Sequence, residues 1–284
     1  MPTTPDESPS YGDDRDWLLR FCPPACAPTL RALFDVERET ATSARADLEH
    51  QVAHVRLEWW QEELTRLAHS QPRHPATRTL AVDAAARSVS PPDLRALIEY
   101  VRVDLACVAF LRREELDEHL GNWAQSIFRH ATLLDPALSY PSIDSRELRS
   151  EAEGFATRAG PIVRELELLR EFTRHARSGR IYHPLGDPPA PHEAWVADPL
   201  SPNEVAQLER RRQTLVTMAK THAASVPKNA RSALRIPLLW LSFALAPPAD
   251  RPARLDPLRR TIAAWRGALA LERGALPSTL LQER

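Results

Sequence analysis

Apolar side chains recur along most of the chain at spacings of three and four residues, with short polar or proline-containing breaks between the segments. This period places the apolar positions on one face of a helix. Within residues 47–67, for example, Val52, Val55, Trp59 and Leu67 recur at helical spacing. The pattern predicts helices over residues 28–45, 47–67, 76–87, 90–108, 114–134, 144–158, 162–177, 201–225 and 255–273, and a further buried apolar helix at 236–246.

Capping residues mark several of the predicted helix ends. Ser201 is followed by Pro202 and Glu204, which is the arrangement of a capping serine, a first-turn proline and a capping-box glutamate. The pair Gly160-Pro161 predicts a joint between two helices, because proline interrupts helical hydrogen bonding. Residues 180–202 are rich in proline and predict a long loop.

Composition narrows the fold class. The chain has 8 glycines and 26 prolines in 284 residues, and alternating runs of β-branched residues are nearly absent. We therefore expect an all-α protein. A superhelical repeat would show an internal sequence period, and none is evident, so a single orthogonal bundle with a central cavity is favoured. Residues 1–16, rich in proline, serine and aspartate, are expected to form a disordered tail, and residues 17–284 one helical domain.

Charge and cysteine content limit the functional classes. The formal net charge of −1 gives no general attraction for nucleic acid. Three cysteines, Cys22, Cys26 and Cys107, favour a reducing compartment over a disulfide framework. The N-terminus lacks the features of a secretory signal, and the apolar run 236–246 is too short to span a bilayer. We expect a cytoplasmic protein, and peripheral contact with the inner membrane stays compatible with the sequence.

The segment 160–184, GPIVRELELLREFTRHARSGRIYHP, resembles the second signature of squalene and phytoene synthases, G-x-A-x-Q-x-x-N-I-L-R-D-x-x-x-D-x-x-x-G-R-x-Y-x-P. The matching positions are Gly160, Leu168, Leu169, Arg170, Ala176, Arg177, Gly179, Arg180, Ile181, Tyr182 and Pro184. The stretch 55–64, VRLEWWQEEL, resembles the R-L-x-W-W-x-x-E-L region of one bacterial and mitochondrial branch of that family. In all, the resemblance covers residues 28–270 and implies the isoprenoid-synthase type of helical bundle.

The departures from the family pattern concern its chemistry. The resemblance implies two aspartate motifs on facing helices that bind Mg²⁺ and hold a diphosphate. The second-motif aspartates align with Glu171 and His175. The first-motif positions fall near Ala41, Thr42 and Arg45, none of which is a carboxylate.

Two sets of residues are candidates for binding. Glu167, Glu171 and His175 are spaced to share one helical face and could form half of a divalent-metal site, although interleaved arginines favour a salt-bridged face instead. Arginine guanidinium groups grip phosphate bidentately, so a second set could bind a diphosphate or another anion without metal, unless its members pair with carboxylates. This set comprises Arg170, Arg174, Arg177, Arg180 and Tyr182.

Two functions of different class follow. The first is a non-catalytic homologue that binds a protein partner or an isoprenoid-like or other lipid-like ligand, as the resemblance to the complex I assembly-factor branch implies. The second is a prenyltransferase that uses isoprenyl diphosphates in squalene- or carotenoid-type biosynthesis. We expect no cofactor in the first case and Mg²⁺ in the second. Nucleic acid is not an expected partner in either case.

Overall fold

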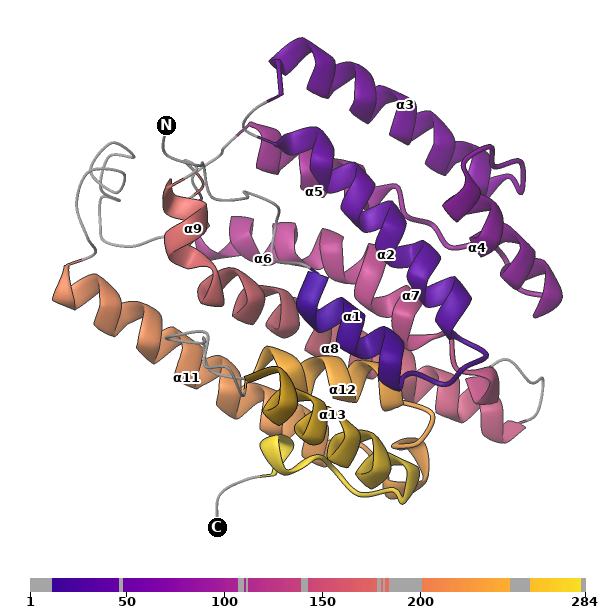
Figure 1. The fold of residues 1–284 in the computed structure, drawn as a ribbon, viewed down its shortest axis with the longest axis vertical. Helices are drawn as coiled ribbons and strands as arrows, with labels where there is room; N and C mark the ends of the chain where they lie inside the picture. The colour runs from indigo at the N-terminus through magenta and orange to yellow at the C-terminus, as the bar shows by residue number, and fades with distance from the viewer. Residues whose placement is uncertain are drawn as a thin grey trace.

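A computed structural model describes residues 12–45, 48–106, 110, 112–138, 143–177, 180, 182–183, 201–245 and 256–281. Within these residues all regular structure is helical (Figure 1). The α-helices are α1 (Gly12–Phe21), α2 (Ala27–Ala41), α3 (His50–Ala68), α4 (Pro75–Ala86), α5 (Ala96–Leu105), α6 (Arg113–Trp123), α7 (Arg129–Thr132), α8 (Ile143–Arg170), α9 (Phe172–Arg177), α11 (Pro202–Ser225), α12 (Arg235–Ala244) and α13 (Asp256–Glu272). The predicted all-α fold is confirmed.

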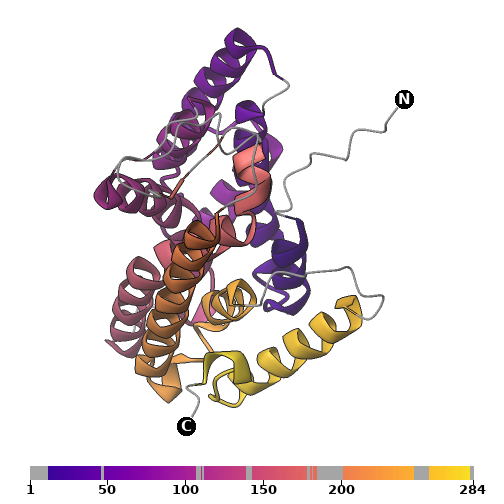
Figure 2. The ribbon, with the colours of Figure 1, turned by 90° about the vertical axis from the view of Figure 1, so that its left-hand side faces the viewer.

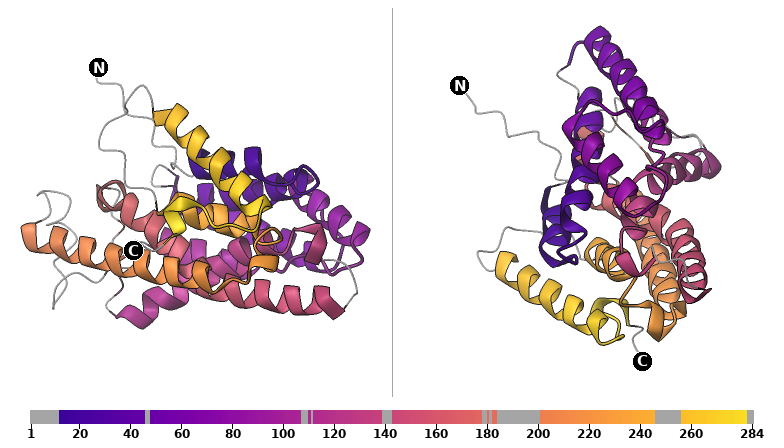
Figure 3. Two further views of the ribbon diagram at one scale, coloured as in Figure 1. Left: turned by 90° about the horizontal axis from the view of Figure 1, so that it is seen from below. Right: turned by 90° about the vertical axis from the view of Figure 1, so that its right-hand side faces the viewer.

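The long helix α8 is the axis of the bundle. It packs against α6, α11 and α12, and it runs alongside α11 for much of its length (Figures 1 and 3). Buried apolar residues extend along α8 from Ala152 through Phe155 and Ile162 to Leu166. Helices α1, α2 and α5 lie on the other side of the centre, and α3 and α4 cover α2 and α5 (Figure 2). The facing surfaces of α2 and α8 therefore border the middle of the bundle.

The predicted joint at residues 160–161 is wrong, because α8 continues through Pro161 without a break. A proline inside a helix costs about 3 kcal/mol, since it removes one hydrogen bond and crowds the preceding turn. Burial of Ala159, Ile162 and Val163 around the proline opposes that cost. Gly160 adds to the fit, because a Cβ there would lie 2.7 Å from the Cβ of Ala124. The two backbones thus approach more closely than a side chain at residue 160 would allow.

The predicted helix over 114–134 is present with an irregular centre. It starts as α6, passes through a π-helical turn at Ala124–Phe128 and ends as α7. A π-turn inserts an extra residue into a helix and is often found at functional sites. Here the turn faces Gly160 of α8.

The structure confirms one of the other helix boundaries predicted from the sequence and corrects two. The capping box at Ser201 and Glu204 is present and opens α11. The helix expected from residue 90 starts only at Ala96. The disordered tail expected for residues 1–16 is wrong for residues 12–16, because α1 begins at Gly12 and buries Asp14 and Arg15; residues 1–11 lie outside the described residues.

The two adjacent tryptophans of α3 point in different directions. Trp60 is buried in the core, whereas Trp59 is half-exposed. Both rings pack edge-on against His74, at centroid distances of 5.0 Å from Trp60 and 6.0 Å from Trp59. Trp59 thereby covers the junction between α3 and the start of α4.

A buried carboxylate ties three parts of the bundle together. Glu165 of α8 accepts two hydrogen bonds from Arg113 of α6, at 2.6 and 2.7 Å, and two from Arg211 of α11, at 2.7 and 2.9 Å. His183 lies 3.4 Å from the same carboxylate. Burial alone would raise the pKa of Glu165, but these donors hold that pKa well below its usual range.

Within the described parts of the chain, none of the helices combines the length and the apolar character that a membrane crossing needs.

Candidate functional site

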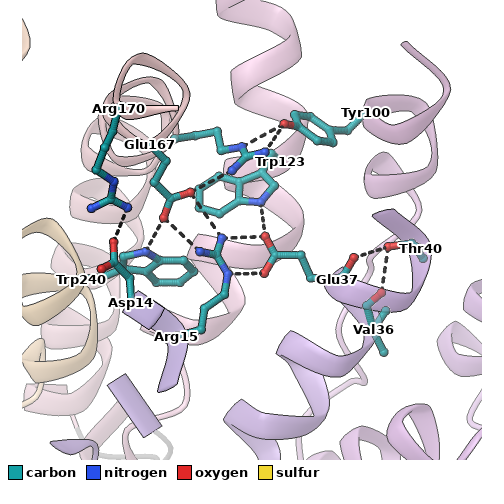
Figure 4. A network of polar contacts seen from close by, with 11 residues as sticks. Asp14, Arg15, Val36, Glu37, Thr40, Tyr100, Trp123, Glu167, Arg170 and Trp240 are labelled. Carbon is teal, nitrogen blue, oxygen red and sulfur yellow. Dashed lines mark hydrogen bonds and ion pairs between the residues drawn. The ribbon is translucent and has the colours of Figure 1, made fainter. Parts of the chain in front are cut away.

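An arginine from the first helix lies in the centre of the bundle between two glutamates. Arg15 of α1 donates to both carboxylate oxygens of Glu37 on α2, at 2.8 Å each. It also donates to both carboxylate oxygens of Glu167 on α8, at 3.1 and 3.3 Å. Figure 4 shows the guanidinium bridging the two acids. One positive group therefore links helices that are far apart in sequence.

Two buried indoles complete the coordination of these glutamates. Trp123 donates its ring N–H to Glu37 at 2.7 Å, and Trp240 donates its ring N–H to Glu167 at 2.9 Å (Figure 4). The Arg15 guanidinium carbon also lies 5.0 Å from the centroid of the Trp240 ring. Aromatic faces stabilise a desolvated cation, so the tryptophans both satisfy the acids and shield the arginine.

A second arginine balances the charge of the cluster. Arg164 of α8 donates to Glu167 at 2.9 Å and to the hydroxyl of Tyr100 on α5 at 2.7 and 2.9 Å. The central cluster, defined as Arg15, Glu37, Tyr100, Trp123, Arg164, Glu167 and Trp240, contains two arginines and two glutamates, all buried. Its formal charge is therefore zero when all four groups are ionised.

The electrostatics favour the ionised state of this cluster. Burial alone would raise the pKa of Glu167, but the positive charges of Arg15, Arg164 and Arg170 lower it to about 2. Burial alone would lower the pKa of Arg15, but Glu167 and Glu37 raise it above its ordinary value. Both shifts keep the ion pairs charged at neutral pH.

A pocket of about 230 Å³ lies beside the central cluster, between α1, α2 and α5. Its apolar lining includes Leu19, Phe34, Leu97 and Val101. Its polar lining includes the exposed Arg31, Arg38 and Arg45, the acids Asp16 and Asp35, and the cluster residues Arg15, Glu37 and Arg164. Asp35 pairs with Arg38 at 2.5 Å. The sequence-predicted first-motif positions, Ala41, Thr42 and Arg45, all line this pocket. The pocket therefore combines an apolar wall with a rim in which arginines outnumber acids.

The three residues predicted to share a metal-binding face are divided by their contacts. The carboxylate of Glu167 is held in the central cluster. Glu171 and His175 instead approach each other, with 3.4 Å between the carboxylate and the imidazole. Among the residues that the structure describes, no group of three or more histidine, cysteine, aspartate or glutamate side chains is placed to hold a metal ion.

The predicted anion-binding residues make contacts within the protein. Arg170 pairs with Asp14 at 2.5 Å and also approaches the carbonyl of Phe243 at 3.5 Å. Arg180 donates to the carbonyl of Ala44. The side chains of Arg174 and Arg177 lie outside the described residues. The structure thus gives Arg170 and Arg180 roles in joining α8 and its C-terminal continuation to α1 and to the end of α2.

Tyr182 belongs to an aromatic cluster beside the central one. Its hydroxyl donates to Asp104 at 2.9 Å, and His119 lies 3.4 Å from the same carboxylate. The His119 ring is stacked on Tyr100 at 4.1 Å and, less closely, on Tyr182 at 5.8 Å. Burial alone would raise the pKa of Asp104, but His119 and the nearby arginines lower it. Tyr100 connects the two clusters, because its ring stacks on His119 and its hydroxyl accepts hydrogen bonds from Arg164.

Sequence reasoning missed most of the central cluster. Arg15 lies in the segment for which the sequence predicts a disordered tail, and Trp123 and Trp240 lie in predicted helices that give no sign of polar contacts. Glu167 is a candidate metal ligand by its spacing to Glu171 and His175, and the interleaved arginines of the same segment favour a salt-bridged face instead. The opposite charges of Arg164 and Glu167, three residues apart, are the one sign of the cluster in the sequence.

The family model for squalene/phytoene synthase matches residues 9–266. Comparisons with curated proteins and with solved structures give no significant match. The matched range includes every helix from α1 to α12 and most of α13, and so contains the central cluster and the pocket. The chain therefore belongs to the squalene/phytoene synthase family.

Proposed function

We propose that this chain is a non-catalytic member of the family, which keeps the bundle and its pocket but does not ionise a prenyl diphosphate. The single observation that carries the proposal is the position of Arg15. Its guanidinium fills the space between Glu37 and Glu167, the two buried carboxylates that face each other from α2 and α8. An arginine supplied by the protein occupies the place where a catalytic site would need open acids.

The hydrogen bonds of the two glutamates support this proposal. Mg²⁺ requires near-octahedral oxygen ligands and keeps several waters, so it needs accessible carboxylate oxygens. Each oxygen of Glu37 and Glu167 already accepts at least one hydrogen bond from Arg15, and Trp123, Trp240 and Arg164 add further donors. A metal ion would have to displace Arg15 and leave that arginine buried without its partners, which is strongly unfavourable.

The pocket supports binding of an isoprenoid-like ligand. Leu19, Phe34, Leu97 and Val101 offer an apolar wall for a hydrocarbon chain. The arginines of the rim offer contacts for a polar or anionic end without metal. Such a ligand would be held and not converted, because the acids beside it are neutralised.

The contacts of Arg170, Arg180 and Tyr182 do not favour the prenyltransferase alternative. These residues motivated it because they match the family signature. In the folded chain Arg170 pairs with Asp14 and Tyr182 with Asp104, and Arg180 holds the carbonyl of Ala44. Intramolecular partners account for the retained residues without a diphosphate.

The test is calorimetric titration of farnesyl and geranylgeranyl diphosphate into the full chain, with and without Mg²⁺, together with an assay for released pyrophosphate. We expect the same affinity with and without Mg²⁺ and no pyrophosphate. The variant Val101→Trp, which fills the pocket, is expected to abolish binding, whereas Val82→Trp on the exposed face of α4 is the matched control.

The outcomes separate the parts of the proposal. Tighter binding in Mg²⁺ with pyrophosphate release would refute the non-catalytic function. Absence of binding under both conditions would refute the isoprenoid-like ligand. Binding of a protein partner would then be the remaining function for a non-catalytic bundle. Equal binding by the two tryptophan variants would exclude the pocket as the site.

A further inference from the structure

Helix α13 has apolar residues on two faces. One face packs into the bundle through Ala264, Ala268 and Leu271, which are at most 3% exposed. On another side of the same helix, Ile262 is 40% and Trp265 is 55% exposed. Helical geometry of about 100° per residue places Trp265 roughly 95° and Ile262 roughly 155° from the centre of the buried face. The exposed pair therefore forms a second apolar face, which begins beside the buried one and extends to the far side of the helix.

The position of α13 in the fold leaves this second face open. The helix lies at the edge of the bundle, where it contacts α12 and α1 (Figures 2 and 3). Leu269, on the same side as Ile262 and Trp265, is only half-buried. Single exposed apolar residues are common on protein surfaces, but two exposed side chains, one of them a tryptophan, and a half-buried leucine on one helical side form a contiguous apolar surface, which is typical of a binding site.

The charges beside this face are positive. Arg266 and Arg273 are exposed and lie roughly 40° and 20° around the helix from Ile262. Neither arginine makes an ion pair with any residue that the structure describes, whereas the neighbouring acid, Glu272, is bound to Arg235 at 2.7 Å. The surface thus pairs apolar side chains with uncompensated positive charge.

A second exposed apolar patch, on α3, lacks this excess of positive charge. Val55 is 60% and Trp59 is 43% exposed there, with Glu58 exposed beside them and Glu62 paired with Arg66 at 3.3 Å. An anionic partner would therefore be attracted at α13 and not at the α3 patch. Charge is the property that distinguishes the two patches.

We propose that α13 docks this protein onto the surface of an anionic lipid bilayer, with Ile262, Trp265 and Leu269 entering the interface and Arg266 and Arg273 contacting lipid phosphates. Helices that lie in a membrane interface combine an apolar face containing tryptophan or leucine with flanking arginines. Tryptophan favours the headgroup level of a bilayer, and arginine reaches the phosphates while its carbon chain stays in the apolar layer. The docking is independent of whether the bundle is catalytic.

The test is co-flotation of the full chain with vesicles of phosphatidylcholine alone and of phosphatidylcholine with 30% phosphatidylglycerol. We expect binding only to the anionic vesicles, with a loss on raising the salt concentration. The variant Arg266→Gln/Arg273→Gln should weaken the partition about 30-fold at low salt, because each arginine near an anionic surface contributes about fivefold. Ile262→Ser/Trp265→Ser should abolish flotation, whereas the control Val55→Ser/Trp59→Ser on α3 should float like the wild type.

Three results would overturn the proposal. The first is failure of the wild type to float with anionic vesicles. The second is equal loss of flotation in the α3 control and the α13 variants, with unchanged helical circular dichroism in all of them. The third is a dimer in light scattering that Ile262→Ser/Trp265→Ser dissociates while vesicle binding persists, since a second copy of the chain would then occupy this face.

Discussion

Replacement of Arg15 by methionine removes the one group that bridges Glu37 and Glu167 among the described residues. Methionine keeps most of the volume and the unbranched stem, so the main change is the loss of one buried charge. In the wild type two arginines balance two glutamates, and in the variant a single arginine, Arg164, remains. Glu167 keeps Arg164 and Trp240, but Glu37 keeps only the indole N–H of Trp123.

The expected loss of stability follows from that imbalance. Removing one partner of a buried ion pair costs about 3–5 kcal/mol. For a chain of this size, such a loss lowers the melting temperature by about 6–20 °C. Urea unfolding followed by circular dichroism and by tryptophan fluorescence measures it, since Trp123 and Trp240 both touch the cluster.

A second substitution tests whether charge is the cause. Glu37→Gln in the Arg15→Met background removes the unpaired charge and keeps a carbonyl oxygen for Trp123. The double variant should regain about 2 kcal/mol over Arg15→Met, although it has lost more polar groups. A loss below about 1 kcal/mol in Arg15→Met, or further destabilisation by Glu37→Gln, would refute the argument that a balanced ion cluster holds the centre.

Three other perturbations follow from the described contacts. Glu165→Gln should destabilise the protein by about 2 kcal/mol at pH 7. Because the pKa of Glu165 is held low in the folded state, the stabilisation by its charge is present above pH ~4.3 and is lost on further acidification. Urea titrations of the variant and the wild type should therefore converge in acid. Gly160→Ala should cost about 1–2 kcal/mol of unfolding free energy in the same assay, because its Cβ would lie 2.7 Å from the Cβ of Ala124. Adding Ala124→Gly should recover part of that loss. A neutral or stabilising Gly160→Ala would show that the two backbones can separate. Burial raises the pKa of Cys26 to about 12. Mass spectrometry should therefore find the Cys26 peptide unmodified by iodoacetamide at pH 8 in the folded protein and modified in urea. Rapid labelling of the folded protein would contradict the burial of Cys26.

Local sequence rules predicted those elements whose ends depend on nearby residues. The capping box of α11 needs only Ser201 and Glu204, so it was visible in the sequence and is present in the structure. Pro161 misled the same rules, because packing from other helices holds α8 straight through it. The contact of Gly160 with Ala124 that accompanies this packing joins residues far apart in the chain.

The central cluster was hidden from the sequence for the same physical reason. The partners of Arg15 lie 22 and 152 residues away, and nothing near Arg15 signals that its charge will be satisfied in the interior. An acidic, proline-containing N-terminus predicts disorder by composition, yet α1 is held in the bundle by these distant acids and by burial of Leu18. The departures from the family's aspartate pattern were visible in the sequence, but the ion pairs of the central cluster required the fold.

The origin of Arg15 in the first helix also has a consequence for folding during synthesis. Residue 15 leaves the ribosome long before Glu167 and Trp240, so the growing chain carries an arginine that has Glu37 but not yet its partners from α8 and α12. Helix α1 can complete its docking only after α8 and α12 have been made, which gives the earliest segment of the protein one of the last steps of assembly.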